Sequence, residues 1–392
     1  MKILHTSDWH LGHTIYNYDR TEEQAEMLLQ IEEIAKTQKP DVFLLCGDVY
    51  HTSQPSNAVQ TMFANSLVKI HEANPGMTIV ITAGNHDSGT KHDIFRTPWR
   101  ALNVFTIGNL SAEARSGENY DEHIIEIPGK GYVVAVPYVH ERNMPDQFYK
   151  HLLEEVEKRN TNNLPVVLTA HTTVRGCDIT GHDTAMKDSV GGIDYFDVAD
   201  FGSDYDYVAL GHIHHAQFVH TGKHNVRYCG TPLPISFDER FNHSITMVEI
   251  DSHGAQPKYE TVEIGNPHPL VTLPTQDFAN WEEAKELLKN YPDDIPAYIR
   301  MNIKVEDFLP STASAEAAEI VKNKKCRFCY INARRVTSES KETTGMTIQE
   351  FRSEDPLQIA KRYAADSQKP FDEDMEELFS EVLQIINSEE RN

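Results

Sequence analysis

Over residues 1–252, short apolar runs alternate with longer stretches in which apolar residues recur every three or four positions. Helical periodicity is clearest over residues 21–39 and 56–73, where apolar side chains fall on one face. The intervening runs are short and apolar, as expected of buried strands. We predict such strands at residues 3–6, 42–46, 79–83, 166–170 and 207–210. Strands that alternate with helices indicate a layered α/β architecture.

The pattern changes near residue 267, where Pro267, Pro269 and Pro274 indicate a linker. A second, smaller α/β pattern follows, with two helix-like and two strand-like stretches. We expect helices at residues 279–288 and 313–322, and strands at residues 299–305 and 328–336. The pattern therefore divides the chain into a first domain over residues 1–265 and a small α/β domain over residues 275–340.

A helical segment over residues 345–392 is predicted to end the chain. Asp355-Pro356 is a favourable helix start, and Pro370 interrupts the pattern. Apolar residues then recur at helical spacing, namely Met375, Leu378, Phe379, Val382 and Ile386. The stripe fits a helical hairpin packed on its own core, and it fits equally a surface that binds a partner helix.

Composition points to a globular protein that is not embedded in a membrane. Hydrophobic residues make up 39% of the 392 residues and charged residues 24%, and no apolar stretch is long enough to span a bilayer. The first apolar run leads at once into Asp8 and His10, so it is not a signal peptide. Five scattered cysteines favour a reducing cytoplasm, and the Cys326-x-x-Cys329 pair has no nearby partners for a zinc site.

The net charge of −24 is unfavourable for a simple nucleic-acid binder, but the charge is unevenly distributed. Basic residues cluster within residues 322–335, and a local basic patch can attract phosphate because salt screens distant acids. The candidates for DNA contact are Lys322, Lys324, Lys325 and Arg327. The alternative for this cluster is a solvated surface without a ligand.

Each of the five predicted strands ends in side chains that can bind a metal ion. These candidate ligands are Asp8, His10, Asp48, Asn85, His171, His212 and His214. A single histidine or a Gly-Asp pair at a strand end is commonly structural. Five such strand ends are hard to explain as turn chemistry, and in α/β sheets such ends share one edge. We therefore expect these side chains to converge on a metal site.

The mixture of donors indicates the metal. Carboxylates, one amide oxygen and several imidazoles suit Mn, Fe or Zn better than Mg or Ca. Seven ligands exceed the needs of one ion, whereas two ions about 3.5–4 Å apart, bridged by one carboxylate, would use all of them. Such a pair activates water and neutralises charge on a phosphate, so the sequence favours phosphoester hydrolysis.

These motifs resemble those of the calcineurin-like metallophosphoesterase superfamily. The residues that carry the resemblance are Asp8-x-His10, Gly47-Asp48, Gly84-Asn85-His86-Asp87, His171 and Gly211-His212-x-His214. Residues 4–12, 209–214 and 228–239 look like those of the SbcD nuclease subunits of bacterial SbcC–SbcD complexes, relatives of the Mre nucleases. The resemblance implies a four-layer β-sandwich flanked by helices, a small α/β capping domain and a C-terminal helical hairpin.

The resemblance also implies a role for each site residue. One ion would bind Asp8, His10, Asp48 and His214, and the other Asp48, Asn85, His171 and His212, so that Asp48 forms the bridge. The expected ions are two Mn²⁺, with Mg²⁺, Fe²⁺ or Zn²⁺ as substitutes. His86 would contact the scissile phosphate, and Asp87 would orient His86 through its other ring nitrogen. His51 would face the phosphate, unless it is an exposed loop histidine.

Finally, the resemblance implies a manganese-dependent DNA nuclease that processes DNA ends and hairpins in repair and recombination. ATP-stimulated double-strand exonuclease and single-strand endonuclease activities are expected. So is a homodimer whose C-terminal helices bind the SbcC ATPase, with two copies of each subunit. A small-molecule or protein phosphoesterase on the same fold is the alternative, and the capping region argues against it. A scaffold without metals is a third hypothesis, which the complete ligand set disfavours.

Overall fold

The computed structural model describes residues 1–181, 195–219, 225–306 and 308–336, together with residues 357, 361, 375 and 379. The chain divides into two compact units, Met1–Arg334 and Arg335–Asn392. All the strands and helices that follow belong to the first unit, apart from the last residue of the final strand. Among the described residues, none of the helices is both long and apolar enough to cross a membrane.

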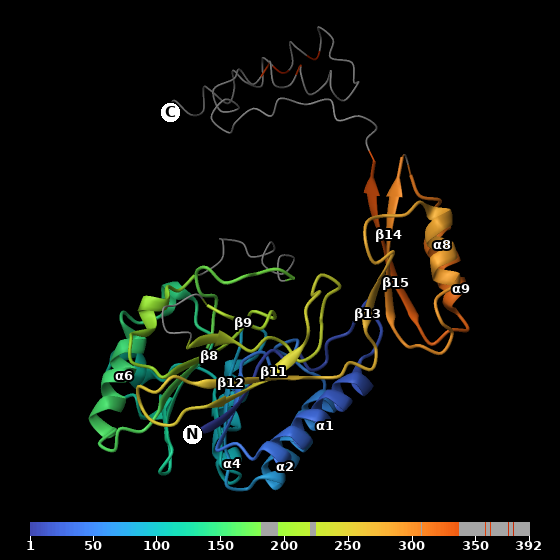
Figure 1. Ribbon diagram of the computed structural model, residues 1–392. Coiled ribbons are helices and arrows are strands. Elements are labelled where there is room, and N and C mark those ends of the chain that lie inside the picture. Colours follow the sequence, from blue (N-terminus) through green and yellow to red (C-terminus); the bar gives the residue numbers. More distant parts are fainter. Residues whose placement is uncertain are drawn as a thin grey trace. The chain divides into compact units, whose positions relative to one another are not determined.

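The first sheet has six strands in the order β12-β11-β1-β2-β3-β4. Its strands β11 and β12 are labelled in Figure 1. Neighbouring strands from β1 to β4 run parallel, and β11 and β12 pair antiparallel at one edge. The strands are β1 (Lys2–Thr6), β2 (Val42–Cys46), β3 (Thr78–Thr82), β4 (Val104–Ile107), β11 (Ser244–Glu249) and β12 (Lys258–Glu263). Helices α1 (Thr21–Gln38) and α2 (Asn57–Ala73) pack against each other and against this sheet.

The second sheet also has six strands, in the order β5-β6-β7-β8-β10-β9. The central strands β6, β7, β8 and β10 run parallel, and the two edge strands are antiparallel. The strands are β5 (Ile124–Ile127), β6 (Gly131–Val136), β7 (Val166–His171), β8 (Tyr207–Gly211), β9 (Gln217–Phe218) and β10 (Val226–Tyr228). Helix α6 (Phe148–Arg159) packs on the outer face of this sheet.

The alternation of side chains along β2 explains how the layers stack. Val42, Leu44 and Cys46 join a core shared with the second sheet, whereas Phe43 and Leu45 join the core under α1 and α2. Because successive side chains of a strand point to opposite faces, a fully apolar strand needs cover on both sides. The result is the order helices, sheet, sheet, helix, so the predicted four-layer α/β sandwich is confirmed.

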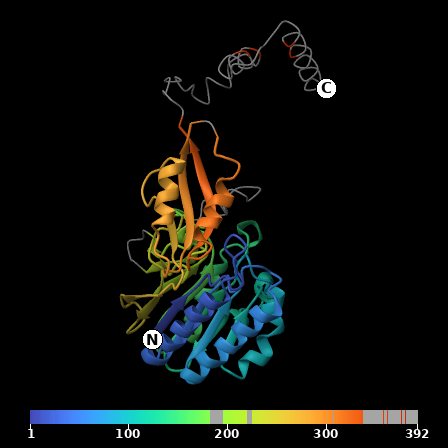
Figure 2. The ribbon, with the colours of Figure 1, turned by 90° about the vertical axis from the view of Figure 1, so that its right-hand side faces the viewer.

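A small sheet in the order β13-β14-β15 forms a lobe of its own, coloured orange in Figure 2. Its strands are β13 (Leu270–Leu273), β14 (Tyr298–Val305) and β15 (Arg327–Arg335), and its helices are α8 (Trp281–Lys289) and α9 (Ala313–Val321). The prediction of a linker was wrong at Leu270–Leu273, which pairs in parallel with β14. We call this lobe, residues 270–335, the cap. Cys326 is buried in its core, and Cys329 is a free, half-buried cysteine.

Polar contacts tie the cap to the sandwich. The Tyr298 hydroxyl donates to Glu23 Oε1 at 2.6 Å, and the Tyr18 hydroxyl donates to the Phe328 carbonyl at 3.0 Å. Arg300 on β14 donates to Asp238 at 2.8 Å. These bonds join β14 and β15 to the first turn of α1, to the loop before it and to the loop after β10.

Short elements complete the connections. They are α3 (Gly89–Ile94), α4 (Arg96–Arg100), α5 (Ala112–Ser116) and the 3-10 turns Asp121–His123, Glu141–Asn143 and Val198–Phe201. In the C-terminal segment, Met375 and Phe379 are helical, and Met375 is 52% exposed. The predicted hairpin as a whole lies outside the described residues, as do Leu378, Val382 and Ile386.

Candidate metal centre

The predicted ligands follow the carboxyl ends of five parallel strands. Strands β1, β2 and β3 of the first sheet lead into Asp8, His10, Asp48 and Asn85, and strands β7 and β8 of the second lead into His171, His212 and His214. Packing of the two sheets brings these ends together. Asp8, His10 and His214 form one group and Asp48, His171 and His212 a second, with the ligand atoms of each group within 4.8 Å of one another.

Asp48 belongs to the second group and also lies close to the first. Its Oδ2 is 3.7 Å from His10 Nε2 and 3.4 Å from His171 Nε2. Within the first group, the Nε2 atoms of His10 and His214 are 3.2 Å apart. Asn85 joins the second group, since its Oδ1 lies 3.1 Å from His171 Nε2 and 3.0 Å from His212 Nδ1. The structure thus brings together all seven predicted ligands.

The spacing of these donors fits divalent metal ions. With metal–ligand bonds of about 2.0–2.1 Å, two ligands at tetrahedral or octahedral angles lie about 2.8–3.4 Å apart. The observed separations of 3.0 to 3.2 Å within each group match this spacing. The remaining nitrogen of His171 donates to the Cys46 carbonyl at 2.8 Å, which leaves its Nε2 to face the site. Two carboxylates, one amide oxygen and four imidazoles can therefore hold two ions.

Four of the candidate ligands have a left-handed backbone. The φ angles are 53° for Asp8, 43° for His10, 49° for Asp48 and 95° for His212. Positive φ is uncommon for residues other than glycine, and such strain gathers at functional sites. The sharp turn that follows each strand directs these side chains back over the ends of the sheets. Positive φ also occurs at other residues, such as Lys39 and Asn103, so it accompanies the ligand loops without being confined to them.

Burial and neighbouring charges determine which histidines carry a proton. Burial holds the pKa of His10 well below its ordinary value and lowers that of His212 to about 3, so both are neutral. Burial would also lower the pKa of His171, but the carboxylates of Asp48 and Asp8 outweigh it and raise this pKa to about 9. A proton on His171 thus offsets the buried acids, and it must leave when a metal ion takes its place.

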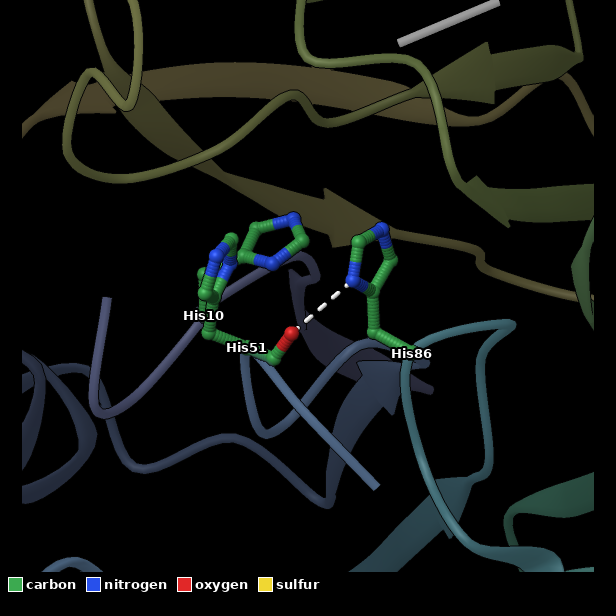
Figure 3. Close-up of side chains that lie close together, drawn as sticks. All are labelled: His10, His51 and His86. Atoms are coloured by element: carbon green, nitrogen blue, oxygen red, sulfur yellow. Dashed lines mark hydrogen bonds between the residues drawn. The ribbon is translucent and has the colours of Figure 1, made fainter. Parts of the chain in front are cut away.

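His51 and His86 lie beside the first group (Figure 3). The two rings stack with centroids 5.6 Å apart, and the His86 and His10 centroids are 4.9 Å apart. His86 Nδ1 donates to the His51 carbonyl oxygen at 2.9 Å, the bond that is dashed in Figure 3. The other nitrogen of His86 therefore remains available to a ligand. Both predicted phosphate-facing histidines are half-buried at the site.

Asp87 does not hold the His86 ring, so that prediction was wrong. Its Oδ2 accepts from the backbone of Gly84 at 2.9 Å and of Val49 at 3.1 Å, and its Oδ1 accepts from Tyr50 at 3.0 Å. The Asp87 carboxylate thus accepts hydrogen bonds from three backbone amides. The partner of His86 Nδ1 is the His51 carbonyl and not Asp87. Asp87 instead ties the turn after β3 to the turn after β2.

Two residues at the site were missed by sequence reasoning. His13 is buried with its ring centroid 4.6 Å from that of His51, and Glu239 Oε1 accepts from His214 Nδ1 at 2.8 Å. Glu239 lies 25 positions from its partner, so no local motif links the two. Its signal in the sequence is its place at the end of residues 228–239, one of the stretches that carry the family resemblance, although that stretch gives Glu239 no role.

The basic residues of the cap have unequal environments. Lys324 Nζ donates to the carbonyl of Tyr291 and pairs with Asp293, and Arg327 donates to the Tyr298 hydroxyl at 3.0 Å. Lys322 and Lys325 have exposed side chains, and Lys322 pairs with Glu319 at 3.0 Å. Surface pairs of this kind contribute little stability and remain open to exchange. Only part of the predicted cluster is thus presented to solvent.

Comparison with known proteins agrees with these motifs. Residues 1–216 match the family described as calcineurin-like phosphoesterase. The SbcD subunit of the SbcCD nuclease of Escherichia coli (strain K12) is 27% identical over 333 residues, covering 79% of each chain. Its namesake in Bacillus subtilis (strain 168) is 27% identical over 416 residues and covers 100% of both chains. A solved dimetal phosphatase from Danio rerio covers 67% of this chain and 99% of its own, with 11% identity and a TM-score of 0.37.

The similarity to SbcD that the sequence motifs suggested is confirmed by these relatives. The family match covers more than half of the 392 residues, including every candidate ligand from Asp8 to His214. The chain belongs to the calcineurin-like phosphoesterase family.

Proposed function

We propose that this chain is a DNA nuclease that hydrolyses phosphodiester bonds with two divalent metal ions. The observation that carries the proposal is the pair of ligand groups that Asp48 connects, beside His51 and His86. Family membership supports hydrolysis of a phosphoester. The choice of DNA as substrate is supported by the SbcD relatives, which are named as part of a nuclease and match over most or all of the chain.

In this proposal, one ion binds Asp8, His10, Asp48 and His214, and the other binds Asp48, Asn85, His171 and His212. We expect Mn²⁺, because imidazoles and carboxylates together suit it, with Fe²⁺, Zn²⁺ or Mg²⁺ as substitutes. Bound ions would supply a water of lowered pKa and would neutralise charge on the phosphate. Oδ2 of Asp48 lies near a histidine of each group, which suits a bridging role.

His86 is proposed to contact the scissile phosphate and to assist the leaving oxygen. Its Nδ1 donates to the His51 carbonyl, so its Nε2 is the atom that would meet the substrate. His51 is proposed to face the same phosphate from its stacked position at 5.6 Å. Asp87 would act on this pair indirectly, since it holds the backbone of Tyr50, just before His51, and of Gly84, two residues before His86.

The cap is proposed to guide DNA toward the metal centre. Lys322 and Lys325 have exposed side chains suited to phosphate contact, which positions a nucleic acid without reading its sequence. Lys324 and Arg327 are engaged within the protein and would support the cap instead. The net charge of −24 makes such local cations the main attraction for DNA outside the metal centre.

We also propose assembly into a homodimer and binding to an SbcC-type ATPase, with two copies of each subunit. Ile94, the last residue of α3, is 66% exposed, and Phe95, which joins α3 to α4, is 46% exposed. Adjacent large apolar side chains at the surface favour contact with another protein, here a second copy of this chain. The C-terminal apolar stripe from Met375 to Ile386 would bind the ATPase. ATP-stimulated exonuclease and endonuclease activities belong to this complex.

The decisive experiment offers two substrates to the purified chain with Mn²⁺. One is end-labelled duplex DNA, tested with and without the SbcC-type ATPase and ATP, and the other is a small phosphodiester. We expect cleavage of both. Asp48→Ala should abolish both activities because it removes a ligand from each ion, while circular dichroism stays unchanged. Hydrolysis of the small ester without any cleavage of DNA would favour the alternative, a small-molecule or protein phosphoesterase. Full activity of Asp48→Ala would contradict the shared ligand.

A further inference from the structure

Glu239 is a buried carboxylate to which neither the predicted ligand sets nor the proposed chemistry assigns a role. Its side chain has no exposed surface, and both of its oxygens are engaged. Oε1 accepts from His214 Nδ1 at 2.8 Å, and Oε2 accepts from the backbone amide of Ile235 at 3.1 Å. A carboxylate in the interior needs such partners, since an unpaired buried charge is costly. Glu239 is therefore fixed in place and directed at one candidate metal ligand.

The bond to Glu239 determines which nitrogen of His214 faces the site. With the proton of Nδ1 donated to the carboxylate, Nε2 keeps its lone pair and lies 3.2 Å from His10 Nε2. Carboxylates that hold metal-binding histidines in this way fix the tautomer and ring orientation and raise the basicity of the ligand. Glu239 thus acts on the group formed by Asp8, His10 and His214.

The turn that carries Glu239 is held by two arginines. Arg20 Nη1 donates to the Pro234 carbonyl at 2.7 Å. Arg300 Nη1 donates to Asp238 at 2.8 Å, and its Nη2 donates to the Phe237 carbonyl at 3.2 Å. Arg300 belongs to β14 of the cap, and its side chain is only 3% exposed. The cap therefore forms hydrogen bonds with the two residues that immediately precede Glu239.

The second ligand group is held differently. His171 Nδ1 donates to the Cys46 carbonyl at the end of β2, and His171 itself ends β7. Both of these strands belong to the sandwich, so the bond that orients His171 does not pass through the turn that Arg300 supports. Glu239 thus connects the cap to the group that contains His214, whereas the sandwich itself orients His171.

We propose that Glu239 is a positioning residue for His214, and that Arg300 stabilises the turn that presents it. The metal affinity of the subsite of Asp8, His10 and His214 then depends on the contact between the cap and the turn before Glu239. The metal affinity of the subsite of Asp48, His171 and His212 does not. This inference rests on the proposed function, because it takes each ligand group to bind one ion. It adds a structural route by which the domain proposed to guide DNA sets the affinity of one metal subsite.

The test is a calorimetric titration of the metal-free full chain with Mn²⁺. We expect two binding events in the wild type, one of which His214→Ala removes and thereby identifies. Glu239→Gln should lower the Mn²⁺ affinity of that same event by about 10–100-fold, the range typical for the loss of such a partner. The affinity of the other event should not change. Glu260→Gln, an exposed acid on β12, is the matched control and should change neither event.

A second variant tests the connection to the cap with Glu239 in place. Arg300→Lys keeps the charge but loses the two-pronged contact, so it should weaken the same event by a smaller factor. Arg334→Lys, on the exposed end of β15, is its control. Thermal unfolding of the metal-free proteins separates this effect from general destabilisation, which would lower the affinity of both subsites. Two unchanged events in Glu239→Gln, or equal weakening of both, would overturn the inference. A wild-type chain that binds a single ion would instead overturn the two-metal proposal itself.

Discussion

At the scale of single residues, the partner of one histidine nitrogen decides what the other nitrogen can do. His171 donates to the Cys46 carbonyl, His214 to Glu239 and His86 to the His51 carbonyl. In each case the second nitrogen is left to face the site. This arrangement reduces the reorganisation needed when a cation or a phosphate arrives, because the rings are already oriented.

His5 gives a pH-dependent contribution to stability. It is fully buried on β1, where its ring accepts from the Tyr207 hydroxyl and donates to the Leu210 carbonyl. Burial lowers the pKa of His5 from 6.5 to about 3, with Arg227 adding to the effect. The unfolded chain takes up a proton below about pH 6.5, whereas the folded chain does not until about pH 3. The stability that depends on neutral His5 is therefore fully present above pH 6.5. As the pH falls toward 3, the free energy of unfolding decreases by at most about 1.4 kcal/mol for each pH unit through this group.

The measurement is the free energy of unfolding by urea between pH 7 and pH 4. His5→Gln should reduce the slope relative to the wild type, since glutamine can make both hydrogen bonds without titrating. His151→Gln, an exposed substitution on α6, should leave the slope unchanged. Identical slopes in His5→Gln and the wild type would show that His5 does not titrate as expected.

At the scale of elements, the turn that follows each strand positions the ligands. A side chain at Gly84, two residues after β3, would collide with the carboxylate and the backbone amide of Asp48. The same turn is tied to β2 by the contacts of Asp87 with the amides of Val49 and Tyr50. Close approach of these two turns lets Asp48 and Asn85 serve one site.

Gly84→Ala should therefore displace Asp48 and reduce manganese affinity. A collision of this kind typically costs about 1–3 kcal/mol of stability. Gly76→Ala, just before the same strand, is the matched control, because a side chain there meets nothing within 4 Å. Manganese titration and urea unfolding of both variants measure the difference. Normal metal binding by Gly84→Ala would mean that the turn can move without disturbing the site.

At the scale of the whole molecule, neither sheet holds a complete ligand set. The first supplies both aspartates, Asn85 and His10, and the second supplies the other three histidines. The site therefore exists only when the sheets pack on their shared core of Ile3, Leu44, Val167 and Tyr207. The cap has a separate core, but it contacts the sandwich through Tyr298, Arg300 and Tyr18.

Removal of residues 355–392 tests the proposed partner segment. The unit Met1–Arg334 contains the three cores of the sandwich and that of the cap, so the truncated chain should keep its melting temperature and its hydrolysis of a small phosphodiester. Its co-purification with an SbcC-type ATPase should be lost. Unchanged co-purification, measured beside the full-length chain, would contradict the assignment of the C-terminal apolar stripe.

The sequence by itself determined the main strands, the large helices and the seven candidate ligands. Apolar periodicity is local, and a ligand that follows a buried strand is visible as a polar residue at the end of an apolar run. It did not reveal strand β13, because three nearby prolines resemble a linker and the strand is stabilised by pairing with β14. Short strands such as β5 and β9 depend in the same way on neighbours that are distant in sequence.

Only the tertiary structure decided which side chains and backbone groups hold the two sets of ligands in place. Asp87 binds backbone amides instead of His86, and Glu239 reaches His214 across 25 residues. Lys324 and Arg327 turn inward, while Lys322 and Lys325 remain exposed. These outcomes follow from the packing of one sheet on another, which brings together turns with no relation along the chain. Strand ends specify the chemistry of the site, and the contact between the sheets specifies its geometry.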